Sequence, residues 1–407
     1  MNKNSEIGIE RTGATAAAGF LAAGVACGVR YEGRRDLGLL LSEEVDGGAV
    51  AVVVTTNVVK AAPLLVTREA VEGGNVRAVV VNSGVANAAT GERGLEDAGR
   101  MQALAAAELK LEPEEVAVAS TGVIGEHLPM DRVEAGIKEA AASLSGDSSP
   151  FAEAILTTDT CTKEAVATVE IGGEVVTVGG VAKGSGMVHP NMATMLAFVT
   201  TDAVIEKECL QNALDGATER TFNRITVDGD TSTNDMVLLM ANGAAGNEPL
   251  RQDSSDYPAF EEAIEAVMRK LAKEIARDGE GATKLIEVVV EGAKDEASAA
   301  TLAKAVVGSS LVKAAAYGED ANWGRVLAAL GYAGVPFDPE GVEIQFGTVK
   351  VFEKGEPVAH DAAEANTTLA KGEIVITARL GEGEGSASAW GCDLTHEYVE
   401  INGSYRS

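Results

Sequence analysis

The sequence predicts a mixed protein of the α/β or α+β class, and three observations support this prediction. Short runs rich in valine have the length and composition of buried strands. Other segments repeat apolar residues every three or four positions, as amphipathic helices do. The 407-residue chain is 46% hydrophobic and only 4% aromatic, so it contains enough aliphatic material for a sizeable core in one to three domains.

The expected elements follow one another along the whole chain. Strands are predicted at 49–54, 77–81 and 286–290, and amphipathic helices at 95–109 and 260–276. Glycine and asparagine mark the turns, as in Asn82-Ser83-Gly84 and Asn242-Gly243. The polar stretch 247–256 is predicted as an exposed loop. A turn at 338–341 introduces a short, strand-rich C-terminal region from about residue 335.

The first apolar run, residues 14–29, resembles the core of a secretory signal. However, Glu6 and Glu10 interrupt the positive region that precedes such a core, and four glycines lie in or beside the run. We therefore expect a tightly packed internal segment. No other stretch is long and apolar enough to span a bilayer, so we expect a cytoplasmic protein.

Charge, cysteine and histidine content exclude several classes of partner and site. The net charge of −29 is spread along the chain and repels nucleic acid and anionic membranes. The cysteines have no paired spacing, which argues against a disulfide framework or a Cys-x-x-Cys zinc site and favours a reducing compartment (Cys27, Cys161, Cys209 and Cys392). The histidines also lack metal-ligand spacing, so no metal is expected (His127, His189, His360 and His396).

Common catalytic motifs are missing from the chain. It has no Gly-x-x-x-x-Gly-Lys-Ser/Thr phosphate loop and no Gly-x-Ser-x-Gly nucleophile elbow. The segment 228–235 begins like a calcium loop, but its sixth position is Thr233 instead of glycine and its twelfth is Leu239 instead of glutamate. We interpret this segment as a polar turn near an active site.

The segment 183–202 suggests self-cleavage. It brings a glycine-rich approach and Pro190 to Ala193 and Thr194, just ahead of an apolar strand. A threonine hydroxyl held against its own preceding carbonyl can attack through a five-membered ring, and water then frees the threonine amine. The exposed Thr194 would carry both a nucleophilic hydroxyl and an α-amine whose pKa lies near neutrality, so no histidine base is needed. However, most threonines at the head of a strand are there because threonine favours β-structure and forms local hydrogen bonds. The local pattern alone therefore leaves an ordinary structural role open.

The rest of the chain strengthens this hypothesis. The Thr194 segment resembles the signature of the ornithine acetyltransferase family, also called bifunctional glutamate N-acetyltransferases, and the similarity covers nearly the whole sequence. The matching segments are 19–28, 55–57, 82–84, 120–125, 228–235 and 320–325. One departure is Val85, where many members of the family carry asparagine.

The resemblance implies a fold, a reaction and an assembly. The fold is a layered helix-sheet-sheet-helix sandwich with a smaller C-terminal domain. The reaction is a ping-pong transfer of acetyl from N2-acetylornithine to glutamate in arginine biosynthesis. Self-cleavage gives an alpha chain of residues 1–193 and a beta chain of residues 194–407, and two such pairs form a heterotetramer. No metal or organic cofactor is implied, although acetyl-coenzyme A is a second acetyl donor in bifunctional members.

The same resemblance assigns roles to individual residues. Thr194 matches the nucleophile, with cleavage at Ala193-Thr194, and Thr121 with Gly122 matches the oxyanion hole. The family's substrate contacts fall on Thr160, Lys183, Thr194, Glu280, Asn402 and Ser407. A cationic Lys183 and an anionic Glu280 suit the carboxylate and the distant ammonium of an acetylated amino acid. Either residue would otherwise be a solvated surface charge.

Two other functions remain open from the sequence. A hydrolase or aminopeptidase with an N-terminal nucleophile shares the acyl-threonine but lets water take the acyl group. A non-catalytic relative would bind an amino acid for regulation. The motifs outside the nucleophile segment favour transfer, and we expect the bifunctional form that also uses acetyl-coenzyme A.

Overall fold

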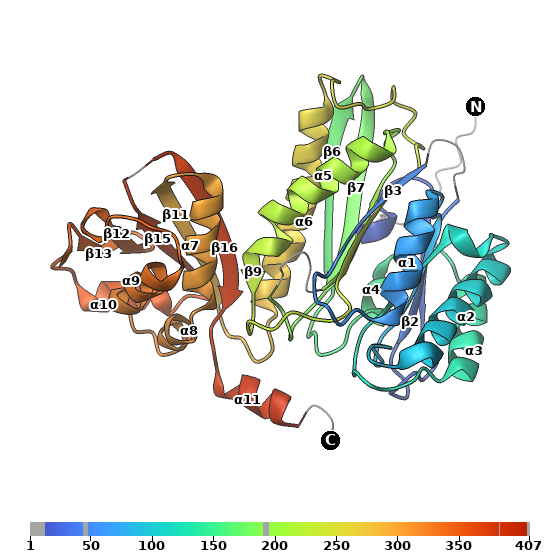
Figure 1. Ribbon diagram of the computed structural model, residues 1–407, viewed down its shortest axis with the longest axis horizontal. Helices are drawn as coiled ribbons and strands as arrows, with labels where there is room; N and C mark the ends of the chain where they lie inside the picture. The colour runs from blue at the N-terminus through green and yellow to red at the C-terminus, as the bar shows by residue number, and fades with distance from the viewer. Residues whose placement is uncertain (1–12, 44–47, 190–194, 382, 405–407) are drawn as a thin grey trace, which may run out of the picture. The chain divides into compact units, whose positions relative to one another are not determined.

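The computed structural model describes residues 13–43, 48–189, 195–381 and 383–404, and these fall into two compact units (Figure 1). The first unit contains the chain up to Gly184, then Asn191–Phe222 and Thr231–Leu271. The second contains Ser185–Pro190, Asn223–Asp230 and the chain from Ala272 onward. The second unit therefore begins earlier in the chain than the strand-rich region expected from about residue 335.

A four-stranded sheet forms one half of the first unit. Its strands have the order β1 (Phe20–Val25), β2 (Leu37–Ser42), β4 (Ala78–Asn82) and β5 (Val116–Ser120), with only the β4–β5 pair parallel. The helices α2 (Gly91–Leu109) and α3 (Met130–Ala142) cover one face, where Met101 and Ile137 share a cluster with Val80 and Val118 (Figure 1). The helix α1 (Ala62–Gly73) packs against β5.

A five-stranded sheet forms the other half. Its order is β3 (Ala49–Val54), β10 (Met236–Ala241), β8 (Leu196–Thr201), β7 (Glu174–Lys183) and β6 (Lys163–Ile171), with only β10–β8 parallel. The helix α5 (Lys207–Arg220) packs on β3 and β10. The long helix α6 (Tyr257–Arg277) approaches β7 so closely at Gly180 that an added Cβ would lie 3.0 Å from Val267.

The two sheets face each other across an apolar interior. Side chains of the four-stranded sheet, such as Phe20 and Val81, share a buried cluster with Phe198 and Leu238 of the five-stranded sheet. Phe151, from the short helix α4 (Ser149–Ala154), meets Phe198 edge to face at a centroid distance of 5.3 Å. Strands covered on both faces are apolar throughout, which explains the valine-rich runs of the sequence. The predicted helix-sheet-sheet-helix layering is confirmed.

The second unit is built on one seven-stranded sheet. The strand order is β14 (Glu356–Pro357), β13 (Val349–Glu353), β12 (Glu343–Phe346), β15 (Glu373–Arg379), β11 (Leu285–Ala293), β16 (Gly385–Cys392) and β9 (Ile225–Thr226). Its helices are α7 (Glu296–Gly308), α8 (Ser310–Tyr317), α9 (Trp323–Tyr332), α10 (Ala362–Leu369) and α11 (His396–Gly403). The core joins α7 and α9 to the sheet through Leu302, Leu330 and Val288.

Several expectations from the sequence can be compared with these elements. All three predicted strands and both predicted helices are present, and 247–256 contains no helix or strand. The run 14–29 contains the buried strand β1, as expected for an internal segment. None of the four cysteines is joined to another by a disulfide bond in the structure. In the part of the chain that the structure describes, no single helix has the length and apolarity of a membrane span, although α7 and α8, bent by 57° where they meet, have them together.

Candidate active site

Thr121 and Gly122 form a tight turn directly after β5. The amide of Thr121 donates to the carbonyl of Asn82 at 3.0 Å, and the amide of Val123 donates to the carbonyl of Gly84 at 3.1 Å. Gly122 has a φ of +133°, and a Cβ there would lie 2.2 Å from the backbone of Gly84. Only glycine fits such a position, so the turn that the family resemblance matches to an oxyanion hole requires glycine at position 122.

Lys183 lies at the end of β7, almost fully buried, and its ammonium faces the Thr121 turn. Its Nζ donates to Thr157 Oγ1 at 2.7 Å and to Thr121 Oγ1 at 3.4 Å, and it lies 3.7 Å from Asp159 Oδ2. Two residues that the sequence placed in the site, Thr121 and Lys183, are therefore in contact although 62 positions separate them. Lys183 is not a solvated surface charge.

Asp159 is the centre of a buried group of charges that sequence reasoning missed. Its Oδ1 accepts from Lys163 Nζ at 2.8 Å and from the amide of Gly184 at 2.6 Å. Burial alone would raise the pKa of this carboxyl, but the charges of Lys183 and Lys163 hold it below its ordinary value. Asp159 is thus an anion at neutral pH.

Thr160, the residue matched to a substrate contact, lies next to Asp159 but is exposed. It belongs to the loop between α4 and β6, where Thr157 and Asp159 point inward to Lys183. A signal for the missed residues was present in the sequence, since Asp159 stands beside the matched Thr160 and has a lysine, Lys163, four positions on.

Asn234 and Asp235 precede β10 and belong to the segment interpreted as a polar turn. Asn234 Nδ2 donates to the carbonyl of Ala86 at 2.6 Å and to that of Ser120 at 2.8 Å, so it fixes the residue just before Thr121. Asp235 is buried, its Oδ2 has no hydrogen-bond partner, and burial raises its pKa well above the ordinary value. Asp235 therefore holds a proton at pH values where an exposed aspartate is ionised.

The candidate nucleophile itself, Thr194, lies outside the described residues, as do Ala193 and Ser407. The described chain resumes at Met195, whose carbonyl accepts from the amide of Met236 at 2.8 Å. Leu196, the first residue of β8, pairs with Met236 on one side and with Lys183 on the other. The start of β8 is therefore flanked by Lys183 on one side and by Met236, which follows Asp235, on the other.

In the second unit, the structure brings Glu280 and Asn402 together. Asn402 Nδ2 donates to Glu280 Oε2 at 2.7 Å, and Glu280 is 7% exposed. The amide of Glu280 donates to the carbonyl of Ser185 at 2.9 Å, and a Cβ added to Gly186 would lie 2.3 Å from the Glu280 carboxyl group. The two residues matched to substrate contacts therefore form one polar group, with Gly186 leaving room for its carboxylate.

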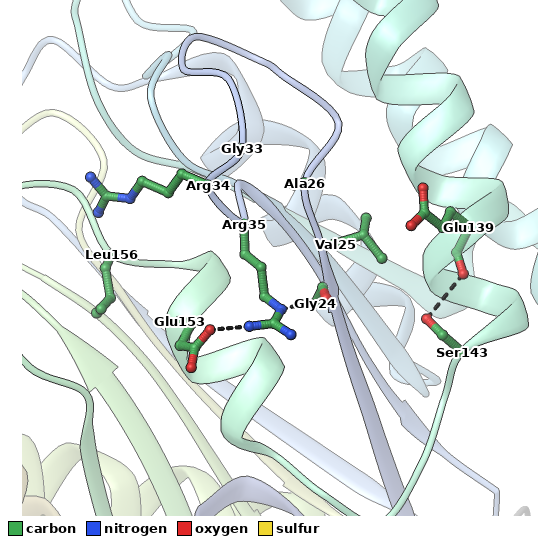
Figure 2. A pocket seen from close by; sticks show the side chains of 10 residues that line it. All are labelled: Gly24, Val25, Ala26, Gly33, Arg34, Arg35, Glu139, Ser143, Glu153 and Leu156. Carbon is green, nitrogen blue, oxygen red and sulfur yellow. Dashed lines mark hydrogen bonds and ion pairs between the residues drawn. The ribbon is translucent and has the colours of Figure 1, made fainter.

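A cavity of about 830 Å³ lies elsewhere on the first unit (Figure 2). Figure 2 shows Arg35 reaching Glu153 and the carbonyl of Gly24, while the Arg34 side chain extends in another direction. Arg34 donates to the carbonyl of Thr157 at 2.7 Å. None of the described residues assigned to the site lines this cavity. Among the described residues, no group of three or more histidine, cysteine, aspartate or glutamate side chains is arranged to hold a metal ion.

Comparison with known proteins identifies the family. The model of the ArgJ family matches residues 21–407. An arginine biosynthesis bifunctional protein ArgJ from Symbiobacterium thermophilum is 58% identical over 398 residues, which are 97% of this chain and 98% of that protein.

Two solved structures are also similar. The crystal structure of ArgJ from Bacillus halodurans is 50% identical, with a TM-score of 0.50, and covers 51% of this chain and 98% of its own. That of ornithine acetyltransferase complexed with ornithine, from Mycobacterium tuberculosis, is 41% identical, with a TM-score of 0.41, and covers 46% of this chain and 98% of its own. The family match and the full-length relative confirm the resemblance: this chain belongs to the ArgJ family of bifunctional arginine-biosynthesis proteins.

Proposed function

We propose that this acetyltransferase of arginine biosynthesis moves acetyl from N2-acetylornithine to glutamate through an acetyl ester on Thr194. The observation that carries the proposal is the contact of Lys183 with the Thr121-Gly122 turn, next to the start of β8. A cation, a hydroxyl and a glycine turn gathered where the nucleophile's strand begins are the groups that stabilise a tetrahedral acyl intermediate.

The first step is self-cleavage of the bond between Ala193 and Thr194. The Thr194 hydroxyl attacks the Ala193 carbonyl carbon, the amide C–N bond breaks, and the hydroxyl proton passes to the nitrogen. Water then hydrolyses the ester and leaves a free Thr194 α-amine. The Bacillus halodurans chain supports this step, since it is almost completely covered by only about half of this chain, as expected for relatives made of two halves.

The acetyl transfer then uses the two groups of the new N-terminus. The Thr194 α-amine takes the hydroxyl proton while the oxygen attacks the acetyl carbonyl of N2-acetylornithine. The Thr121 hydroxyl and the Gly122 amide stabilise the oxyanion, and the C–N bond to ornithine breaks as that nitrogen is protonated. The amine of glutamate then attacks the acetyl ester and restores Thr194.

Substrate recognition is proposed for the two polar groups already described. Glu280, bonded to Asn402, suits the distant ammonium of ornithine, and Lys183 suits a carboxylate. Thr160 and Ser407 complete the contacts that the family resemblance assigns. We further propose that no cofactor takes part, that acetyl-coenzyme A is a second donor for glutamate, and that two cleaved pairs form a cytoplasmic heterotetramer.

Intact-mass spectrometry of the parent beside Thr194→Ala tests the self-cleavage. We expect two fragments from the parent, divided before Thr194, and one uncut, inactive chain from the variant. A parent that remains a single active polypeptide would refute the mechanism, because a blocked α-amine cannot act as the base.

The partition of the acyl group separates transfer from hydrolysis. The parent is incubated with N2-acetylornithine, with and without saturating glutamate. N-acetylglutamate is the expected main product when glutamate is present, whereas free acetate as the main product would favour the hydrolase. A parallel reaction with acetyl-coenzyme A as the sole donor tests the second donor, and no turnover restricts the enzyme to recycling.

A further inference from the structure

The buried charges around Lys183 have an unusual composition, with two lysines around one carboxylate. The side chains of Lys163 and Asp159 are fully inaccessible to solvent, and the side chain of Lys183 is 8% exposed. Asp159 lies close to Lys163, at 2.8 Å, and farther from Lys183, at 3.7 Å. Because the Lys163 side chain is inaccessible to solvent, it cannot contact a substrate, and its charge has to act inside the protein.

The carboxylate of Asp159 is rigidly held. Besides the two ammonium groups, it accepts from the amide of Gly184 through Oδ1 and from the amide of Thr157 through Oδ2, at 2.6 and 3.0 Å. Lys163 donates a hydrogen bond to Asp159, whereas Lys183, at 3.7 Å, is held near the carboxylate by charge alone. Asp159 thus holds Lys183 in place without neutralising it. The group formed by Lys163, Asp159 and Lys183, with two cations and one anion, keeps one positive charge.

The direction of the bond between Lys183 and Thr121 follows from the chemistry of the ammonium. An ammonium group has hydrogen-bond donors and no acceptor, so Thr121 Oγ1 has to accept from Lys183 Nζ. The hydroxyl's own proton is then free to point at another acceptor. The distance of 3.4 Å is long, as catalytic hydrogen bonds often are before a substrate is bound.

We propose that Lys183 is a positioning residue for Thr121: its ammonium orients and polarises the hydroxyl as an oxyanion donor, and the sealed Lys163–Asp159 pair holds the ammonium there with its charge intact. This role differs from binding a substrate carboxylate, because it acts on the transition state through another side chain. The inference rests on the proposed function, since it needs an acyl intermediate at Thr194.

A double-mutant cycle on kcat tests the coupling between the two residues. Thr121→Val removes the hydroxyl with little change of shape, and we expect a loss of roughly 100- to 1000-fold. Lys183→Met is expected to lose roughly 10- to 100-fold, the usual range for a hydrogen bond to a charged group. If Lys183 acts through Thr121, the double variant falls within about threefold of Thr121→Val alone.

The outcomes of the cycle are distinct. Losses that multiply in the double variant, or a Lys183→Met variant that raises only KM, would overturn the inference while leaving the proposed function intact. No acetyl transfer by the parent enzyme would overturn the proposed function and the inference with it. Thermal melting of each variant shows whether the folded state is retained.

The retained positive charge of Lys183 is tested separately at Lys163. In Lys163→Met, Asp159 is left to neutralise Lys183, so kcat should fall roughly tenfold or more while KM changes little. Adding Asp159→Asn removes that neutralising charge, so the double variant should recover activity relative to Lys163→Met. A merely structural role predicts that the double variant is the worst of the set, and this result would overturn the proposed role of that charge. The cycle on Thr121 still decides the coupling if these buried variants do not fold.

Discussion

At the scale of single residues, burial strongly raises the pKa of the Asp235 carboxyl group. Its carboxyl is buried near Thr55, Ser232 and Lys183, and one oxygen has no partner. An unfolded aspartate ionises near pH 4, whereas burial keeps the folded one protonated to higher pH. Folding then has to retain a proton, so this residue's contribution to stability is fully present below about pH 4 and is lost as pH rises toward the folded pKa.

Asp235→Asn, which has no proton to retain, should therefore be more stable than the parent at neutral pH. We expect a gain in melting temperature of about 2 °C or more at pH 7.5, shrinking toward zero at pH 4. The exposed Asp215→Asn, on α5, serves as the control and should show no such pH dependence. A gain of equal size at both pH values would contradict the account.

A substitution at Gly186 tests the proposed role of Glu280 in substrate binding, because Gly186 leaves room for the Glu280 carboxylate. In Gly186→Ala the new methyl carbon would lie within 2.3 Å of that carboxylate, which has to move away from Asn402. We expect KM for N2-acetylornithine to rise roughly tenfold or more, as for a lost charged hydrogen bond. Gly331→Ala, on α9 with open space around it, should leave KM unchanged. An unchanged KM in Gly186→Ala would show that the Glu280 carboxylate does not hold substrate.

At the scale of elements, Asn234 joins parts of the chain that no single element connects. Its amide nitrogen donates to Ser120, the last residue of β5, and to Ala86, in the loop after β4. Asn234→Ala would leave two buried carbonyls without this donor and cost about 1–3 kcal/mol. The expected result is a fall in melting temperature of about 2–6 °C together with a lower kcat, because the Thr121 turn loses its support.

The control for Asn234 is Asn212→Ala, whose bond to Gln252 is exposed. Its effect on stability should stay within about 0.5 kcal/mol. A normal kcat in Asn234→Ala, with stability reduced, would separate the support of the fold from the support of the Thr121 turn.

Elements buried on both faces were the most readable from sequence, because uninterrupted apolar runs distinguish them. β4 and β8 illustrate this, with every residue buried. The sequence does not distinguish β6 and β7 in this way, since exposed residues, both polar and apolar, alternate with less exposed ones along β6 and begin β7. The Asp159 group was missed for a related reason. It depends on the register that pairs Lys163 with Ala182, next to Lys183, and residue spacing does not encode that register.

At the scale of the whole molecule, the five-stranded sheet interleaves the two halves on either side of the proposed cut. Strands β8 and β10 lie after residue 194, and they sit between β3 on one side and β7 with β6 on the other, all of which lie before it. Both joins between the halves are strand pairs of six residues, from Ala49 to Val54 with β10 and from Val178 to Lys183 with β8. Separating the halves would also open the apolar interior shared by the two sheets.

The cleaved chains should therefore stay together without any covalent link. In native buffer we expect residues 1–193 and 194–407 to co-elute on size exclusion, at the same volume as the uncut Thr194→Ala variant. In denaturing guanidinium chloride the parent should resolve into two species, while the variant remains one. A half that elutes alone in native buffer would contradict the interleaved sheet, because removing β8 and β10 leaves β3 without its neighbour and β7 with an unpaired, apolar edge.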